Sequence, residues 1–191
     1  MEPLLFYLAL LVAQLIFLFG VLLYLARITA NLVSDFFDVP FVATPRRVLS
    51  IIFDELKIVP GDVVYELGSG DGRFLLYAAS REPEAQYIGI ERNPMLLALS
   101  RIRQRLHGNL RNVTFQKGNF FATDLTRASK VYAYLLNSVM NRLYPTLLRD
   151  FHGRFASRAF RFQQKNPMRV VSLGQRPASH GQHELAIYDF D

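Results

Sequence analysis

Residues 63–74, VVYELGSGDGRF, place three glycines at alternate positions between a hydrophobic run and a segment of helical character. Glycine is costly inside regular structure, so such a cluster needs a physical reason. In doubly wound α/β proteins, the loop that leaves the carboxyl end of the first parallel strand and opens a helix binds nucleotide-like ligands. Gly68, Gly70 and Gly72 would let the backbone turn sharply there and let a ligand approach without a Cβ in the way. The stretch therefore predicts an α/β fold with a bound cofactor.

The chain around this loop alternates short apolar runs with helical patterns. Such alternation is typical of right-handed βαβ units in a mostly parallel, Rossmann-like sheet with helices on both faces. No helical pattern separates the last two strand-like runs, so we expect an antiparallel C-terminal strand. The expected strands cover residues 63–67, 86–91, 112–117, 130–136, 155–162, 168–174 and 184–190. The expected helices cover residues 45–57, 73–80, 94–106 and 138–150, the first with Thr44 as its N-cap.

An apolar segment comes before this α/β pattern. Residues 4–26 contain no charged side chain and only Gln14 as a strongly polar group. A helix of this length rises roughly 35 Å, enough to cross a hydrocarbon core of about 30 Å. A cleaved signal peptide is the alternative, but it has a basic start and a shorter apolar core. We therefore expect a transmembrane anchor over residues 1–28, a juxtamembrane connector over 29–47 and a globular domain over 48–191.

Basic residues follow the apolar segment and none precedes it. Under the positive-inside tendency, Arg27, Arg46 and Arg47 place the globular domain on the cytoplasmic side of a single-pass membrane protein. The formal net charge of +6 comes from scattered residues rather than from long runs. For an anchored domain, contact with the lipid bilayer and its anionic headgroups is a simpler explanation than nucleic acid, so no nucleic-acid partner is expected.

Two further patterns predict no site. His180 and His183 form an HxxH pair in a loop that has no nearby acid beyond Glu184, so no metal is expected. Arg101, Arg103 and Arg105 are expected on a solvated helix face.

The spacing within the glycine loop favours one kind of cofactor. The dinucleotide fingerprint requires a glycine where Arg73 stands, and Asp71 opposes an approaching pyrophosphate. S-adenosyl-L-methionine fits better, because it carries no phosphate and its methionine part has an ammonium group that Glu66 or Asp71 could accept. Glu91 ends the second expected strand, where an acidic residue meets ribose hydroxyls.

These residues carry a family resemblance. ELGSGDGR followed by GIERNP resembles motif I and the acidic loop of class I S-adenosylmethionine-dependent methyltransferases. The wider run PFVATPRRVL, GNFFATDL and YLLNSVMNRLYP resembles one branch of that class, the membrane-associated protein-lysine methyltransferases of the ATP synthase c-subunit and the adenine nucleotide translocase, with their prokaryotic relatives. The resemblance covers residues 40–150, and it implies that the globular domain is a methyltransferase domain.

The resemblance also implies roles for individual residues. The methionine part of the cofactor would be held by Glu66, Gly68, Gly70, Asp71 and Gly72. The ribose and the adenine would be met by Glu91, Asn119 and Phe120, with Phe41 and Thr44 covering the cofactor. Tyr134 and Asn137 would face the methyl group and the substrate amine. The residues alone leave Tyr134 open as a sheet-face aromatic and Asn119 as a strand terminator.

The implied reaction is an in-line methyl transfer from an activated sulfonium, for which the enzyme mainly supplies alignment. The resemblance and the apolar segment together predict methylation of a lysine side chain on a membrane-associated protein. Two alternatives stay open at this point: methylation of a lipid or small amphiphile, and a non-catalytic module that binds the cofactor at the membrane.

Overall fold

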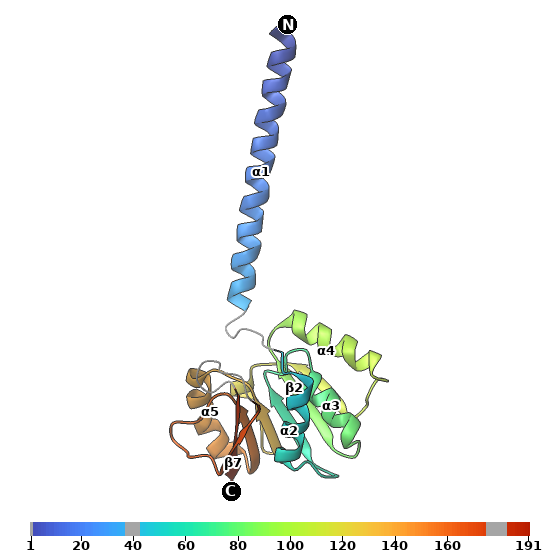
Figure 1. Cartoon of the computed structure of the whole chain (residues 1–191), viewed down its shortest axis with the longest axis vertical. Helices are drawn as coiled ribbons and strands as arrows, with labels where there is room; N and C mark the ends of the chain where they lie inside the picture. The colour runs from blue at the N-terminus through green and yellow to red at the C-terminus, as the bar shows by residue number, and fades with distance from the viewer. Residues whose placement is uncertain (1, 37–42, 175–182) are drawn as a thin grey trace. The chain divides into compact units, whose positions relative to one another are not determined.

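The computed structural model describes residues 2–36, 43–174 and 183–191. The chain divides into two compact units, Met1–Pro40 and Phe41–Asp191. The first unit contains the helix α1, and the second contains the sheet with its covering helices (Figure 1).

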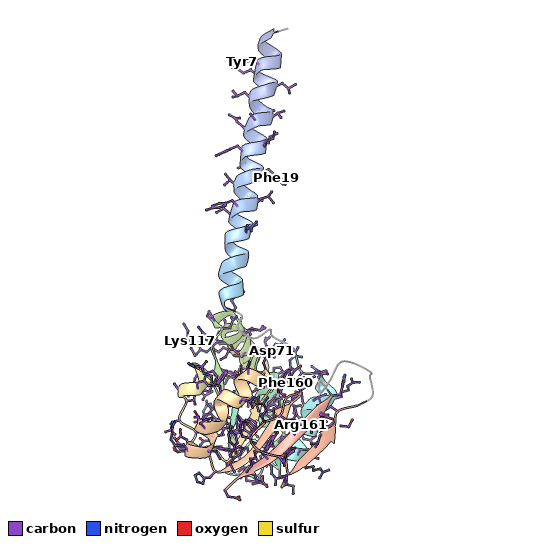
Figure 2. All side chains as sticks on the ribbon, turned by 90° about the vertical axis from the view of Figure 1, so that its left-hand side faces the viewer. Tyr7, Phe19, Asp71, Lys117, Phe160 and Arg161 are labelled. Carbon is purple, nitrogen blue, oxygen red and sulfur yellow. The ribbon has the colours of Figure 1, made fainter. Side chains whose placement is uncertain are left out.

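Helix α1 spans Glu2–Phe36 and carries the apolar segment. Among the described residues, one stretch, Phe6–Arg27, is long and apolar enough to cross a membrane by length and composition. Its side chains are exposed on every side, as Phe17 at 74% and Phe19 at 64% illustrate, and Figure 2 shows Phe19 projecting from the ribbon. A signal sequence meets the same length and composition criteria, so the anchor stays a prediction.

The predicted connector of residues 29–47 includes residues outside the described ranges and stays a prediction. Helix α1 continues to Phe36, and helix α2 begins at Arg46. Pro45, rather than Thr44, occupies the N-cap position of α2, and no side chain caps the helix. The Thr44 hydroxyl accepts a hydrogen bond from Arg158 instead. The prediction of Thr44 as a cap was therefore wrong, because a guanidinium distant in sequence takes its oxygen.

The described residues of the second unit form a seven-stranded sheet of order β3-β2-β1-β4-β5-β7-β6. Strands β1 to β5 run parallel to one another, and β7 pairs antiparallel with both β5 and β6. The prediction of a mostly parallel sheet with an antiparallel C-terminal strand is confirmed. The strands are β1 (Val63–Leu67), β2 (Gln86–Glu91), β3 (Val113–Lys117), β4 (Lys130–Ala133), β5 (Gly153–Arg158), β6 (Arg169–Ser172) and β7 (Glu184–Phe190).

Helices cover the two faces of the sheet and build one core on each (Figure 1). Because successive strand residues point to opposite faces, Val64 joins the core beneath α2 and α3, whereas Tyr65 joins the core beneath α5. Phe74 of α3 packs against Tyr132 of β4 in the first core, with ring centroids 4.8 Å apart. The helices are α2 (Arg46–Leu56), α3 (Arg73–Arg81), α4 (Pro94–Leu106) and α5 (Asn137–Asp150), and a short 3₁₀ turn, η1, spans Phe120–Ala122.

Besides β6, which ends at Ser172, two strands end earlier than the sequence predicts. Strand β4 stops at Ala133, so Tyr134 follows the strand and Asn137 is the first residue of α5. Strand β5 stops at Arg158, and the following Ala159 has a positive φ of 70°. Both strands thus deliver polar residues to the carboxyl edge of the sheet, which is the edge where open α/β sheets bind ligands.

Candidate active site

The glycine-rich loop between β1 and α3 folds back onto β2. The backbone N–H groups of Gly68 and Ser69 both donate to the carbonyl of Ile90, at 2.9 and 3.0 Å. Gly68, Gly70 and Gly72 all have positive φ, at 76°, 54° and 74°. Only glycine adopts this region at little cost, so the three glycines let the chain reverse direction directly after the strand.

Gly72 is required by internal packing as well as by its backbone. A Cβ at this position would lie 2.4 Å from Cζ of Phe115 and 2.9 Å from Cβ of Ser100. The loop therefore packs against β3 and α4 at this point, and side chains of the protein rather than a ligand fill the space beside Gly72. A Cβ at Gly68 would lie 3.2 Å from Leu135, a milder contact.

Glu91 secures the same loop from the end of β2. One of its carboxylate oxygens accepts the N–H of Gly70 at 2.8 Å, and the other accepts the N–H of Asn93 at 2.8 Å. Asn93 in turn caps α4 by accepting the N–H groups of Met95 and Leu96. A carboxylate has about four acceptor positions, so Glu91 keeps capacity for a ligand hydroxyl after both bonds are made.

Asp71 is neutralised within the protein. Nη2 of Arg73 lies 2.5 Å and Nη1 of Arg103 lies 2.6 Å from its Oδ2, and the residue is 2% exposed. Burial by itself would raise the pKa of Asp71, but the hydrogen bonds and charge of Arg73, with the charge of Arg103, outweigh burial and hold that pKa below its usual range. The prediction that Arg103 lies on a solvated helix face was wrong, because its guanidinium bridges α4 to the loop.

Glu66 contrasts with the two other acids. It is 7% exposed, and its Oε2 finds no hydrogen-bond partner in the part of the chain that the structure describes. Burial raises the pKa of Glu66 well above its usual range, and the neighbouring charges of Asp71 and Glu91 raise it further. A buried acceptor without a donor is costly, and such atoms are rare in folded proteins. The Glu66 carboxyl is thus suited to receive a donor from a ligand.

Three more groups meet beside Glu66 at the carboxyl ends of β4 and β5. Tyr132 is 1% exposed, and its hydroxyl is unpartnered among the described residues. Arg158 donates from Nη1 to the Thr44 hydroxyl at 3.0 Å, and its guanidinium lies 4.4 Å from the ring centroid of Tyr134. The predicted residues Thr44 and Tyr134 therefore both contact a cation, Arg158, that sequence reasoning missed.

The residues predicted to meet the adenine lie at the end of β3. The Asn119 side chain accepts the N–H of Phe121 at 3.1 Å and so caps η1, and Phe120 is half-buried. Asn119 also lines a cavity of about 390 Å³ together with Lys117 and Arg127.

Asn137 is exposed at the start of α5. Phe41 lies outside the described residues. Within the described ranges, no group of three or more His, Cys, Asp or Glu side chains is arranged to hold a metal ion.

The fold and site are those of a Rossmann-like methyltransferase. The defining features are a glycine turn after β1, a carboxylate at the end of β2 and an antiparallel β7 beside β5. The family model of the ANTKMT methyltransferase domain matches residues 66–169, and the chain belongs to this family. The match covers the glycine loop, both acids that flank it and the ends of β4 and β5.

Individual relatives agree with this assignment. The chain is 32% identical over 149 residues to a protein-lysine N-methyltransferase of Saccharolobus islandicus, covering 74% of this chain and 89% of that protein. It is 31% identical over 106 residues to the ATP synthase c-subunit lysine N-methyltransferase of Caenorhabditis elegans, covering 56% of this chain and 54% of that protein. A solved RNA methyltransferase from Salinibacter ruber, in complex with S-adenosyl-L-homocysteine, superposes with a TM-score of 0.71 at 30% identity, covering 78% of this chain and 94% of that one.

Proposed function

We propose that this protein is an S-adenosylmethionine-dependent protein-lysine N-methyltransferase that is anchored in a membrane by α1 and acts on a membrane-associated protein. The observation that carries the proposal is the buried Glu66 carboxyl beside the glycine loop, one oxygen of which has no partner among the described residues. The relatives named for lysine methylation support the choice of acceptor.

The residues at the carboxyl edge fit the cofactor. Glu66 would accept its α-ammonium, because its carboxyl has a free oxygen whereas Asp71 is already paired with two guanidiniums. Glu91 would accept the ribose hydroxyls with its remaining lone pairs. Gly68 and Gly70 would offer backbone close to the ligand. Asp71 and Gly72, which the sequence predicts to touch the cofactor, would instead hold the loop in shape.

The remaining predicted residues would complete the site. Asn119 and Phe120 would meet the adenine from the end of β3, and Thr44 would cover the methionine part. Phe41 is proposed as a second cover. Tyr134 and Asn137, on either side of the turn into α5, would face the substrate amine.

When bound, S-adenosylmethionine supplies a methyl group already activated on a positively charged sulfur. The protein then has to align a lysine amine with it and to keep water out, and alignment is worth up to about 7–11 kcal/mol in ideal cases. The lysine must lose its proton first, which removal from water favours by lowering the lysine pKa. Tyr134 would wall the site, and the Asn137 side-chain oxygen would accept a hydrogen bond from the amine.

The membrane part of the proposal depends on α1. Its exposed apolar surface needs a non-aqueous environment, and Arg27 at the end of the apolar stretch favours a globular unit on the cytoplasmic side. A tethered enzyme meets acceptors near the bilayer surface, which is why a membrane-associated substrate is proposed. Methylation of a lipid, and cofactor binding without transfer, are the competing outcomes.

A labelling experiment tests these alternatives together. The full-length protein in detergent is incubated with membranes, total RNA and methyl-labelled S-adenosylmethionine, and the protein, lipid and RNA fractions are separated and analysed by mass spectrometry. Label on lysine supports the proposal. Label only in lipid or only in RNA contradicts it, as does cofactor binding without any transfer.

Matched variants make the labelling experiment specific. Glu66→Gln removes the free carboxylate, and we expect it to abolish labelling at cofactor concentrations that saturate the wild type. Glu84→Gln makes the same change at an exposed site before β2 and serves as the control. Equal labelling by both variants would contradict the assigned role of Glu66.

A further inference from the structure

Arg158 is a buried cation that has no anionic partner among the residues that the structure describes. The residue is 8% exposed, and its Nε has no hydrogen-bond partner among the described residues. Its side chain contacts the Thr44 hydroxyl and the Tyr134 ring, both of which are uncharged. In the part of the chain that the structure describes, no carboxylate forms an ion pair with it. A buried charge is stable only when it is paired and hydrogen-bonded, so this arrangement indicates that a ligand supplies the anion.

The register of the sheet brings Arg158 to the same face and edge as Glu66. Glu66 pairs with Tyr132 across β1 and β4, and Tyr132 pairs with Ala156 across β4 and β5. Arg158 lies two residues beyond Ala156, so its side chain points to the same face. The backbones of Glu66 and Ala156 are thus about two strand spacings, or ~10 Å, apart, and the further rise to Arg158 of about 7 Å puts its backbone ~12 Å from that of Glu66. The long arginine side chain and a small ligand can span that gap.

The Tyr132 hydroxyl lies in the field of both groups. Burial is the main cause that raises its pKa and the Glu66 charge raises it further, whereas the nearby Thr44 hydroxyl and then the Arg158 charge lower it. A carboxyl and a guanidinium, each with an atom that has no partner among the described residues, therefore lie on one face of the sheet at its carboxyl edge, with Tyr132 on the strand between them. The ligand that fits them carries an ammonium and a carboxylate a short distance apart, which describes the α-carbon of an amino acid.

We propose that Arg158, assisted by the Thr44 hydroxyl, binds the α-carboxylate of the cofactor's amino-acid part while Glu66 binds its α-ammonium. This inference rests on the proposed function, since it assigns a further residue to the same cofactor site. Tyr134 stacks on the guanidinium and orients its donor fork, so Tyr134 acts on the cofactor through Arg158. A carboxylate bound to a guanidinium forms charge-assisted and often bidentate hydrogen bonds, which add both affinity and orientation.

Binding measurements with three ligands separate the two ends of the amino acid. S-adenosyl-L-homocysteine carries both charges, its decarboxylated form (the same thioether with an aminopropyl chain) lacks only the carboxylate, and 5′-methylthioadenosine lacks both. Affinities are measured by calorimetry on the full-length protein in detergent. The wild type is expected to bind S-adenosyl-L-homocysteine on the order of 10- to 100-fold more tightly than the decarboxylated ligand, in line with one lost charged hydrogen-bonding pair.

The variants then assign that preference to a residue. Arg158→Met should weaken S-adenosyl-L-homocysteine by on the order of 10- to 100-fold and leave the decarboxylated ligand and 5′-methylthioadenosine within about twofold. Glu66→Gln should weaken both ligands that carry the amine. Arg111→Met, at an exposed arginine after α4, is the control and should change nothing. Arg158→Lys keeps the charge without the planar fork and should recover part of the loss.

Each outcome decides the inference. An equal loss on S-adenosyl-L-homocysteine and the decarboxylated ligand in Arg158→Met would mean that Arg158 only supports the fold, and the inference would be overturned. If Arg158→Met does not fold, the wild-type preference decides, and equal wild-type affinities for those two ligands overturn the inference. A wild type that binds none of the three ligands would overturn the proposed function with it, whereas tight binding without carboxylate preference removes this inference alone.

Discussion

Replacing Gly72 with alanine tests whether the loop is held by packing against the sheet. The alanine Cβ would lie 2.4 Å from Cζ and 2.7 Å from Cε1 of Phe115, and 2.9 Å from Cβ of Ser100. Phe115 is 4% exposed and Ser100 is fully buried, so neither has free space to move into. The backbone would also be strained, because Gly72 has a φ of 74°.

Two contributions set the expected loss of unfolding free energy in Gly72→Ala. An L-residue in the left-handed region costs roughly 1–2 kcal/mol. Overpacking a filled core costs roughly 1–3 kcal/mol. We therefore expect Gly72→Ala to lower the free energy of unfolding by about 2–5 kcal/mol, a large share of the 5–15 kcal/mol typical of a folded protein.

Gly61 supplies a matched control for this change. It has a φ of 83°, but a Cβ there would meet no atom within 4 Å. Gly61→Ala therefore carries the backbone strain and the unfolded-state effect of alanine without the collision. Denaturant unfolding of both variants should show Gly72→Ala less stable than Gly61→Ala by about 1–3 kcal/mol.

A second substitution identifies the collision partner. Phe115→Leu shortens the side chain that faces Gly72, so Gly72→Ala should cost less in that background than in the wild type. Equal destabilisation by Gly72→Ala and Gly61→Ala would refute the packing argument. The glycine would then be explained by its backbone conformation alone.

Three other predictions concern charges and the helix α1. Asp71→Asn should destabilise the protein by roughly 1–3 kcal/mol at neutral pH, since it leaves two partly exposed guanidiniums without their anion. The folded-state pKa of Asp71 is depressed, so the ionised carboxylate stabilises the protein above the ordinary aspartate pKa. This stabilisation is lost as pH falls through the folded-state pKa. The unfolding curves of the wild type and the variant should therefore converge in acid. The raised pKa of Glu66 means that protonation of this carboxyl stabilises the ligand-free protein as pH falls through the folded-state pKa. Binding of the cofactor's ammonium should therefore release the Glu66 proton. Calorimetry in buffers of different ionisation enthalpy should detect this release in the wild type and not in Glu66→Gln. Replacing Leu15 and Leu18 with arginine should move the protein from the membrane pellet to the supernatant, because each charge costs about 2.5–3.5 kcal/mol at the centre of a membrane-spanning helix. Leu106→Arg on α4 should leave the distribution unchanged. Membrane retention by the double variant would argue against the anchor.

The order of the elements could be read from the sequence because each strand is a short apolar run between turn signals. The predicted bounds of β1, β2 and α4 agree with the structure. The apolar pattern fails where a buried loop follows a strand. Leu135 is 3% exposed and packs against the glycine loop, so it continues the apolar run after β4 has ended at Ala133. Periodicity reports burial, and burial alone does not distinguish a strand from a loop beneath the site.

The charged part of the site was harder to predict. Arg103 reaches Asp71 across 32 positions and Arg158 reaches Thr44 across 114, so their partners depend on the folded topology. Neither arginine belongs to a local motif. The acids were recognisable because they stand inside or beside the glycine loop, but the sequence could not say which of them the protein already neutralises.

That distinction determines what the loop can do. Asp71 is balanced by two guanidiniums and Glu91 by two backbone N–H groups, whereas Glu66 has an oxygen to which no described residue donates. The glycine loop therefore uses two of its acids to keep its own shape and leaves one for a ligand. Unpartnered buried groups destabilise the ligand-free protein. A ligand that satisfies them should therefore bind tightly and raise the unfolding temperature. On this argument, the instability of the empty site and the affinity for the cofactor have the same physical origin.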